Sequence, residues 1–166
     1  SKEEVEGLWQ YVLDGTVDFI GSDHSPFLVE EKERGKKDIF AATSGFPGVD
    51  LRYPLMINEA QKGRLPLEKV VKLLAVNPAK DFHIFPQKGT ISAGADADLA
   101  IVDLNKPMTV DWHKNYSHAK EIAKVYDGWK LGNTMEYTIV RGRVVMAHGV
   151  VDEMAAGWGE FVKPIS

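Results

Sequence analysis

The residues best suited to chemistry lie in Gly21–Pro26, which reads Gly-Ser-Asp-His-Ser-Pro and directly follows a β-prone run from Val17 to Ile20. Active sites of parallel barrels form at the carboxyl ends of the strands, so a carboxylate just past a strand is well placed for catalysis. Asp23 could there bind a metal ion and act as a general base toward metal-activated water. An Asp-His pair near a turn could also form an Asx-turn or cap a following helix, and spacing alone favours that structural role.

The segment before Asp23 must supply the elements that position it. Apolar side chains recur there at helical spacing, and glutamates near the start suit the positive end of a helix dipole. The apolar residues are Val5, Leu8, Trp9, Val12 and Leu13. Gly15 is placed to end this helix as a C-terminal cap. A helix that leads into a buried strand at 17–20 is the α-to-β step of an α/β protein.

The segment after Asp23 predicts a long loop and then two regions of different character. Residues 22–48 are polar and rich in turn signals, and such long loops are usually functional or disordered. Helices are predicted over 51–61, 66–74 and 77–82, the last capped by Asn77 with Pro78 at its first position. Short strands are predicted over 90–91, 99–102, 108–110 and twice within 138–151, with a helical or irregular stretch at 117–125. We therefore divide the chain into residues 1–86, which are α/β-like with one strand, and residues 87–166, which are mostly β.

Several other features have structural interpretations. The charged run from Lys32 to Lys37 is typical of a solvated loop face, and the apolar positions of the helices are typical of a core. Asp96 and Asp98 resemble a carboxylate pair, but they alternate with alanine and lead into a strand. That pattern favours turn and strand-edge roles for both.

Composition excludes several classes of function. The chain has 166 residues, a formal charge of −4 and a pI near 5.7, without the clustered basic residues of a nucleic-acid binder. It has no cysteine, so it has no disulfide and no thiol nucleophile, which fits a reducing compartment, and we expect a cytoplasmic protein. No apolar run approaches the roughly 20 residues of a membrane helix, and no signal peptide is evident. We therefore expect neither a nucleic-acid nor a membrane partner.

Five segments together resemble the cyclic amidohydrolases, the group of dihydroorotases, hydantoinases (dihydropyrimidinases) and allantoinases within the amidohydrolase superfamily. Residues 13–26 look like the last-strand motif of that family. Residues 46–50 resemble the loop after its metal site, and 75–80 its asparagine–proline–alanine helix start. Residues 88–99 resemble the strand pair of its small β-domain, and 138–144 the closing strands. The resemblance covers nearly the whole chain.

This resemblance implies roles for particular residues. Asp23 matches the metal-coordinating aspartate that also passes a proton to the leaving nitrogen. His24 follows it, as in relatives with an Asp-His pair, and is expected to contact substrate or support Asp23. The backbone at Ser44 and Gly45 matches the place where hydantoinase-like enzymes hold the ring's amide edge. Ser22 is expected to shape the pocket wall.

The resemblance also implies a metal centre that this chain does not complete. The family uses a His-x-His pair, a lysine and two further histidines, all upstream of the Asp23 motif, and holds divalent metal, which we expect to be two Zn in the intact parent. The histidines here are His24, His83, His113, His118 and His148, and the last four are interpreted as surface or satisfied polar residues. Because a metal needs three or four ligands, we expect this chain alone to be inactive.

The fold that the resemblance implies is a (β/α)₈ TIM-type barrel with a small β-sandwich domain. Residues 1–86 would supply the last barrel strand and the closing helices, and residues 87–166 the C-terminal part of the sandwich. One barrel strand leaves unpaired edge groups and an apolar helix face. We therefore expect the missing N-terminal part or further copies of the chain as partners.

The implied reaction is hydrolysis of a C–N bond in a small cyclic amide or ureide. Hydantoin, dihydropyrimidine, allantoin and dihydroorotate stay open as substrates, although the loop from Ser25 to Gly48 favours the hydantoinase–allantoinase side. Lys or Arg in that loop could serve the carboxylate of dihydroorotate. One alternative is a non-catalytic, dihydropyrimidinase-like scaffold protein, against which the intact Asp23 argues. A weaker alternative is an independent small β-module.

Overall fold

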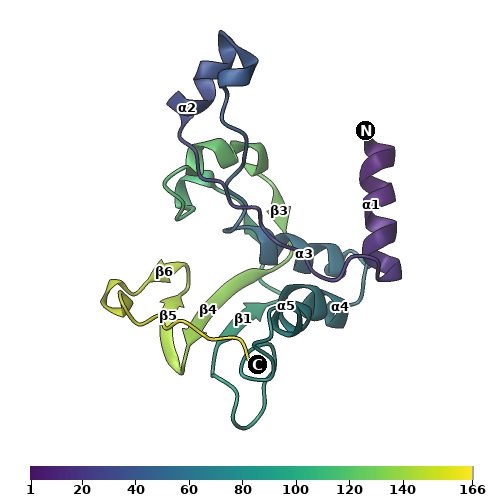
Figure 1. The fold of residues 1–166 in the computed structure, drawn as a ribbon, viewed down its shortest axis with the longest axis vertical. Coiled ribbons are helices and arrows are strands. Elements are labelled where there is room, and N and C mark those ends of the chain that lie inside the picture. The colour runs from purple at the N-terminus through teal and green to yellow at the C-terminus, as the bar shows by residue number, and fades with distance from the viewer. Residues whose placement is uncertain (166) are drawn as a thin grey trace. The chain divides into compact units, whose positions relative to one another are not determined.

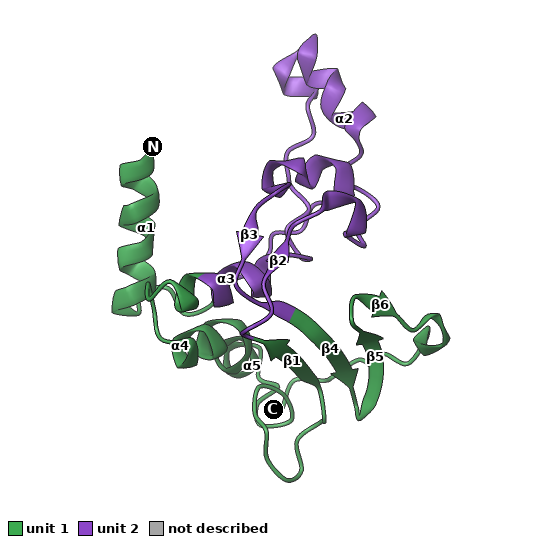
Figure 2. Ribbon diagram, turned by 180° about the vertical axis from the view of Figure 1, so that it is seen from behind, with its two compact units in different colours: residues 1–20, 59–103, 135–166 green, residues 21–58, 104–134 purple. Residues whose placement is uncertain are grey.

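A computed structural model describes residues 1–165 and has an α/β architecture (Figure 1). It divides into two units that are interleaved along the chain (Figure 2). Unit 1 comprises 1–20, 59–103 and the chain from Met135 on, and unit 2 comprises 21–58 and 104–134. The proposed family domains, 1–86 and 87–166, are a different division and stay a prediction.

The first helix, α1 (Lys2–Asp14), ends where the sequence predicts. The Ser1 hydroxyl accepts a hydrogen bond from the Glu4 N–H at 3.2 Å. The Glu4 carboxylate in turn accepts a hydrogen bond from the Ser1 nitrogen, which completes a capping box. Gly15 ends the helix with a φ of 94°. The expectation that its apolar residues form core is wrong, because no residue of α1 is buried and Leu8 is 63% exposed. Nothing in the described chain covers this face enough to bury it.

The predicted strand at 17–20 does not form a strand. The N–H of Val17 donates to the Tyr11 carbonyl at 3.0 Å, and that of Ile20 donates to the Leu73 carbonyl at 3.1 Å. A β-strand is defined by a ladder with a neighbouring strand, and no described strand pairs with this segment. The strand prediction fails here because the sequence has β propensity but the described chain has no pairing edge for it.

A turn at 62–66 separates the first central helix from three helical segments that run on without a break. Helix α3 (Arg52–Gln61) is followed by α4 (Leu67–Val71), a π-helical turn η3 (Lys72–Val76) and α5 (Asn77–Asp81). Asn77 therefore continues a helix and does not cap a new one, which corrects the prediction. Pro78 has no N–H, and its ring would crowd the carbonyl one turn earlier, so a widened π turn is a suitable way to carry the helix past it.

The second half of the chain is strand-rich, as predicted. Strand β1 (Leu99–Asp103), β4 (Thr134–Val140), β5 (Arg143–Ala147) and β6 (Val150–Val151) form a sheet in the order β1-β4-β5-β6. Strand β2 (Met108–Thr109) pairs antiparallel with β3 (Lys130–Leu131). The predicted strand at 90–91 is absent, since this segment is a run of bends. Short helical segments are η4 (Trp112–Lys114), η5 (Lys120–Tyr126) and η6 (Glu153–Ala155).

Each unit has buried residues of its own. In unit 2, Leu51, Val110 and Leu131 form a buried cluster, with Leu55, Met108 and Tyr126 packed against it. The buried Asn133 side chain donates to the Pro54 carbonyl at 3.1 Å, so a polar contact supports the same region. In unit 1 the buried residues come from the α4–α5 run and include Val70, Leu73, Leu74 and Ala79. Within residues 1–165, no helix combines the length and apolar character that a membrane span requires.

Candidate active site

Asp23 has a left-handed backbone conformation and a carboxylate without a bonding partner among residues 1–165. Its φ is 45°, in the left-handed region, which Asp tolerates better than most residues. The residue is exposed, and within residues 1–165 its carboxylate has no hydrogen-bond or ion-pair partner. Residues held in such conformations gather at functional sites, where surrounding structure fixes them. The exposed carboxylate is therefore free to bind a ligand.

The segment around His24 lies beside residues 46–49. His24 and Phe46 form a parallel β-bridge, and the Ser25 N–H donates to the Phe46 carbonyl at 3.0 Å. The Val49 N–H donates to His24 Nδ1 at 3.3 Å. An imidazole nitrogen that accepts carries no proton, so a neutral His24 holds its proton on Nε2 and can donate from there.

The backbone at Ser44 and Gly45 is held by hydrogen bonds from Lys32 and by close packing of Gly45 against Ser25. Lys32 Nζ donates to the Thr43 and Gly45 carbonyls, each at 2.6 Å. Gly45 has a φ of 125°, and a β carbon there would lie 2.2 Å from the Ser25 β carbon, so only glycine fits. Ser44 is exposed, and its N–H and C=O have no hydrogen-bond partner in the part of the chain that the structure describes.

The four predicted site residues, Asp23, His24, Ser44 and Gly45, thus lie in one unit, on two segments that the bridge at His24 holds together. Ser22 lies on the first of them, where its carbonyl would be 2.9 Å from a β carbon on Gly48. These contacts place a carboxylate, an imidazole N–H and a free peptide edge on neighbouring segments.

A complete metal centre is not formed by these residues. No group of three or more His, Cys, Asp or Glu side chains lies together within residues 1–165. His113 interacts with Asp111 at 3.0 Å, and His148 with Glu136 and Tyr137. Hydrogen bonds from the His113 side chain and backbone hold the pKa of Asp111 below its ordinary value. These two histidines therefore have structural partners, as predicted.

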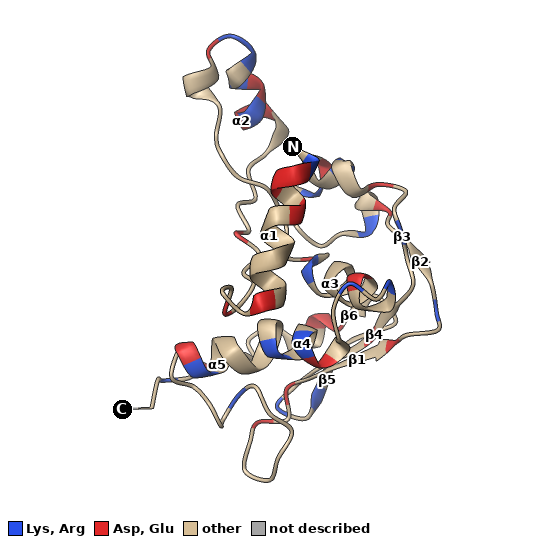
Figure 3. Cartoon of the chain, turned by 90° about the vertical axis from the view of Figure 1, so that its right-hand side faces the viewer, with Lys and Arg blue, Asp and Glu red and all other residues tan. Residues whose placement is uncertain are grey.

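Sequence reasoning missed the role of Lys32. We interpreted 32–37 as a solvated loop face, and charges of both signs do follow one another along α2 (Val29–Glu33) and the next turn, η1 (Arg34–Lys36) (Figure 3). Lys32, however, is half-buried, and its ammonium group lies 5.5 Å from the centroid of the Phe27 ring. No local pattern identifies it, because its partners are carbonyls 11 and 13 residues away.

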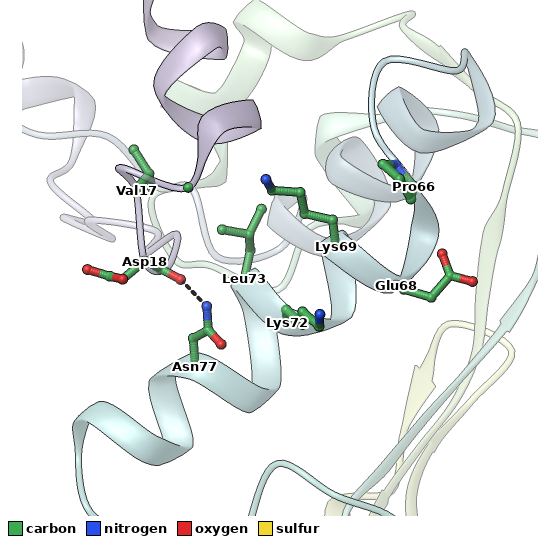
Figure 4. A pocket seen from close by; sticks show the side chains of 9 residues that line it. Val17, Asp18, Pro66, Glu68, Lys69, Lys72, Leu73 and Asn77 are labelled. Carbon is green, nitrogen blue, oxygen red and sulfur yellow. Dashed lines mark hydrogen bonds between the residues drawn. The ribbon is translucent and has the colours of Figure 1, made fainter.

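A hollow of about 330 Å³ in unit 1 is a separate feature (Figure 4). It lies between the end of α1 and the α4–α5 run, and its lining includes Asp18, Lys69, Lys72, Leu73 and Asn77. Asn77 donates its side-chain N–H to the Asp18 carbonyl at 2.6 Å, and Lys69 donates to the Leu13 carbonyl at 2.6 Å. None of the predicted site residues lines it, so it is not the predicted substrate site.

Comparison with known proteins decides the family. A family model described as the amidohydrolase family matches residues 1–145. The chain belongs to the amidohydrolase family. The resemblance inferred from the five sequence segments is thereby confirmed.

The amidohydrolase relatives are enzymes named for cyclic amides. An L-hydantoinase of Paenarthrobacter aurescens is 40% identical over 158 residues, which is 93% of this chain and 33% of that protein. An allantoinase of Rubrobacter xylanophilus is 38% identical over 164 residues, which is 98% of this chain and 35% of that protein. The chain therefore spans about a third of the length of the relatives it matches.

The fold agrees with the same assignment. The solved structure of a D-hydantoinase (dihydropyrimidinase) from Thermus sp. matches 96% of this chain and 34% of that chain with a TM-score of 0.85 at 30% identity. This amidohydrolase chain is thus α/β with the fold of the corresponding part of a hydantoinase.

Proposed function

We propose that the whole protein hydrolyses a C–N bond of a cyclic amide or ureide, with Asp23 as a metal ligand and proton-transfer residue. The observation that carries the proposal is the exposed Asp23 carboxylate, which has a left-handed backbone and no partner within residues 1–165. It lies on a segment joined by the His24–Phe46 bridge to a second segment, in which the Ser44 N–H and C=O also have no hydrogen-bond partner among the described residues. The hydantoinase and allantoinase relatives support the same reaction class.

In the proposed reaction, water adds to the ring carbonyl carbon and the C–N bond breaks. Asp23 takes the proton from the attacking water and delivers it to the departing nitrogen, so that the products are a carboxylic acid and an amine or urea group. A bound divalent metal, which we propose to be a Zn pair, would polarise the carbonyl and activate water. Asp23 fits such a centre because carboxylate oxygen is a zinc ligand, and the other ligands would come from outside this chain.

His24 and Ser44 would bind the substrate. A neutral His24 presents an Nε2–H donor, because its Nδ1 accepts from Val49. The free N–H and C=O of Ser44 form a donor–acceptor pair that matches the C=O and N–H of a cyclic amide. Gly45 would keep this peptide close to Ser25, where any side chain would clash.

We favour an uncharged ring, such as a hydantoin, dihydropyrimidine or allantoin, as the substrate. Dihydroorotase relatives are also similar to this chain; one of Acetivibrio thermocellus is 35% identical over 152 residues. Dihydroorotate carries a carboxylate that needs a cation. Two of the four basic residues of the loop are not poised for that role, because Lys32 is engaged by two carbonyls and Lys36 forms an ion pair with Glu33.

We further propose that residues 1–86 belong to the metal-dependent hydrolase barrel and residues 87–166 to a small β-rich domain of the whole protein. The exposed apolar face of α1 supports a partner surface there. The partner would be the remainder of the protein or another copy of the chain. With one proposed ligand, this chain alone should not hydrolyse the substrate.

The test measures metal content and hydrolysis together. The whole protein and its Asp23→Asn variant are analysed for zinc and assayed with hydantoin, dihydrouracil, allantoin and dihydroorotate. We expect about two metals per whole chain, hydrolysis of at least one uncharged ring, and loss of that activity in the variant. A well-folded whole protein with no metal and no activity on any of the four rings would overturn the proposal.

A further inference from the structure

We propose that Lys32 is a positioning residue that holds the Ser44 peptide in the conformation that binds the substrate ring. This inference rests on the proposed function. It concerns a side chain that does not touch the substrate but fixes the backbone that does.

The contacts of Lys32 are specific for a primary ammonium group. Its Nζ lies 2.6 Å from both the Thr43 and the Gly45 carbonyl oxygens, and the Phe27 ring faces the same group at 5.5 Å. An ammonium has three N–H donors, so two carbonyls and one aromatic face account for all of them. The group is half-buried, and it ties the start of the loop to its end across more than ten residues.

The position of these carbonyls determines what is left for a ligand. Lys32 binds the carbonyls on either side of Ser44, so those two oxygens are already engaged. The N–H and C=O of Ser44 have no hydrogen-bond partner within residues 1–165. Lys32 therefore fixes the residues that flank the Ser44 peptide groups and leaves those groups to a ligand.

Gly45 limits the alternatives. Its φ of 125° and its contact with Ser25 place the backbone where no side chain fits. A glycine is also the residue most free to leave that conformation. Without the Lys32 contacts, the segment 43–45 would sample other peptide orientations, and ligand binding would have to order it.

The first experiment compares Lys32→Met with Lys36→Met in the whole protein. Lys36 is a matched control, because it lies on the same loop but is exposed and contacts Glu33. We expect Lys32→Met to raise KM about tenfold and to change kcat less than about threefold, since Asp23 and the metal are untouched. The control should match the wild type, and zinc content should be equal in all three proteins.

A second experiment restores the amine. This chain has no cysteine, so Lys32→Cys introduces a single thiol into it, and 2-bromoethylamine converts that thiol to a lysine analogue. We expect the alkylated variant to regain most of the wild-type KM, while iodoacetamide, which adds no cation, should not restore it. The wild type treated in the same way is the control for cysteines elsewhere in the protein.

A third readout does not depend on activity. The Ser25 N–H donates to the Phe46 carbonyl, next to the segment that Lys32 holds, so its hydrogen exchange should be faster in Lys32→Met than in Lys36→Met. If the wild type hydrolyses none of the rings, the proposed function fails and this exchange rate alone decides the role of Lys32. If Lys32→Met does not fold, Lys32→Gln takes its place with the same expected results. Unchanged KM and unchanged Ser25 exchange would overturn the inference, as would a loss confined to kcat.

Discussion

Two aspartate motifs in this chain look alike in sequence and differ in structure. Asp23 is exposed and has no partner among residues 1–165. Asp96 and Asp98 are both bound by Lys88, the former at 2.8 Å. Gln87 also donates to Asp96 at 3.1 Å, and the Arg141 N–H donates to Asp98 at 2.7 Å.

The two motifs therefore differ in the partners that their carboxylates already have. Asp96 accepts from a lysine and an amide, and Asp98 accepts from a lysine and a backbone N–H, so the charge of each is paired with Lys88. Asp98 joins the segment at 87–98 to the β4–β5 turn, and Asp96 is bound by Lys88 and Gln87 within that segment, which agrees with their predicted turn and strand-edge roles. Asp23 has the unused capacity that catalysis requires.

The largest expected effect is the loss of activity on changing Asp23. In the whole protein, Asp23→Asn should lower kcat/KM by about 10³-fold or more, because it removes both the proposed proton carrier and a metal ligand. Its melting temperature should stay close to that of the metal-free wild type, since the side chain is exposed and has no partner among residues 1–165. Steady-state kinetics and calorimetry measure the two quantities.

Asp96→Asn is the matched control for that variant, because it makes the same chemical change in the paired motif. It should keep kcat/KM within about threefold of the wild type and lower the melting temperature. Activity lost equally in both variants would contradict the distinction between the two motifs.

A smaller effect is expected from His24. His24→Ala removes the proposed Nε2–H donor and the acceptor of the Val49 N–H, so kcat/KM should fall about tenfold. His24→Asn offers a side-chain acceptor and donor of its own and should recover part of the loss. If neither variant differs from the wild type, His24 has no role in binding.

Lys88 should affect stability alone. Lys88→Met leaves Asp96 and Asp98 without their shared cation, and the melting temperature should fall by about 2–4 °C. Lys69→Met is a useful comparison, because Lys69 donates to one neutral carbonyl, that of Leu13. A change in kcat/KM of the whole protein with Lys88→Met would contradict this expectation and would show that Asp96 and Asp98 influence the proposed active site at Asp23.

The smallest effect is the pH dependence of that stabilisation. The hydrogen bond from Lys88, followed by that from Gln87, holds the pKa of Asp96 below its ordinary 3.8. Burial opposes a raised pKa of Lys88, but hydrogen bonds to Asp96 and Asp98 outweigh it and raise that pKa above its ordinary 10.5. The stability that comes from the lowered pKa of Asp96 is present above the pKa of the unfolded state and is lost as the pH falls through the pKa of the folded state. The stability that comes from the raised pKa of Lys88 is present below its unfolded-state pKa and is lost as the pH rises through its folded-state pKa.

The melting temperatures of the wild type and Lys88→Met should therefore differ most between about pH 4 and pH 10 and converge below about pH 4. Thermal scans across this range measure the difference. A constant gap down to pH 2 would mean that packing, and not charge, makes Lys88 stabilising.

Much of the local structure could be predicted from the sequence. Helix α1 with its end at Gly15, helix α3 and the strands β1, β4 and β5 follow from side-chain periodicity and glycine placement. The family motif also singled out Asp23. The strand at 17–20 and the cap at Asn77 were predicted wrongly, because a strand needs a pairing edge and a π turn carries the helix past Pro78.

The helix and hairpin periodicities, the family and the candidate carboxylate can be recognised from the sequence, since each depends on residue types at short, fixed spacings. The partners of the charged groups, and the backbone groups that these partners engage, appear only in the folded chain. Lys32 binds the carbonyls of Thr43 and Gly45, and His24 accepts from the Val49 N–H. Every residue has a carbonyl and nearly every residue an N–H, so no pattern of side chains marks which of them a distant lysine or histidine will reach.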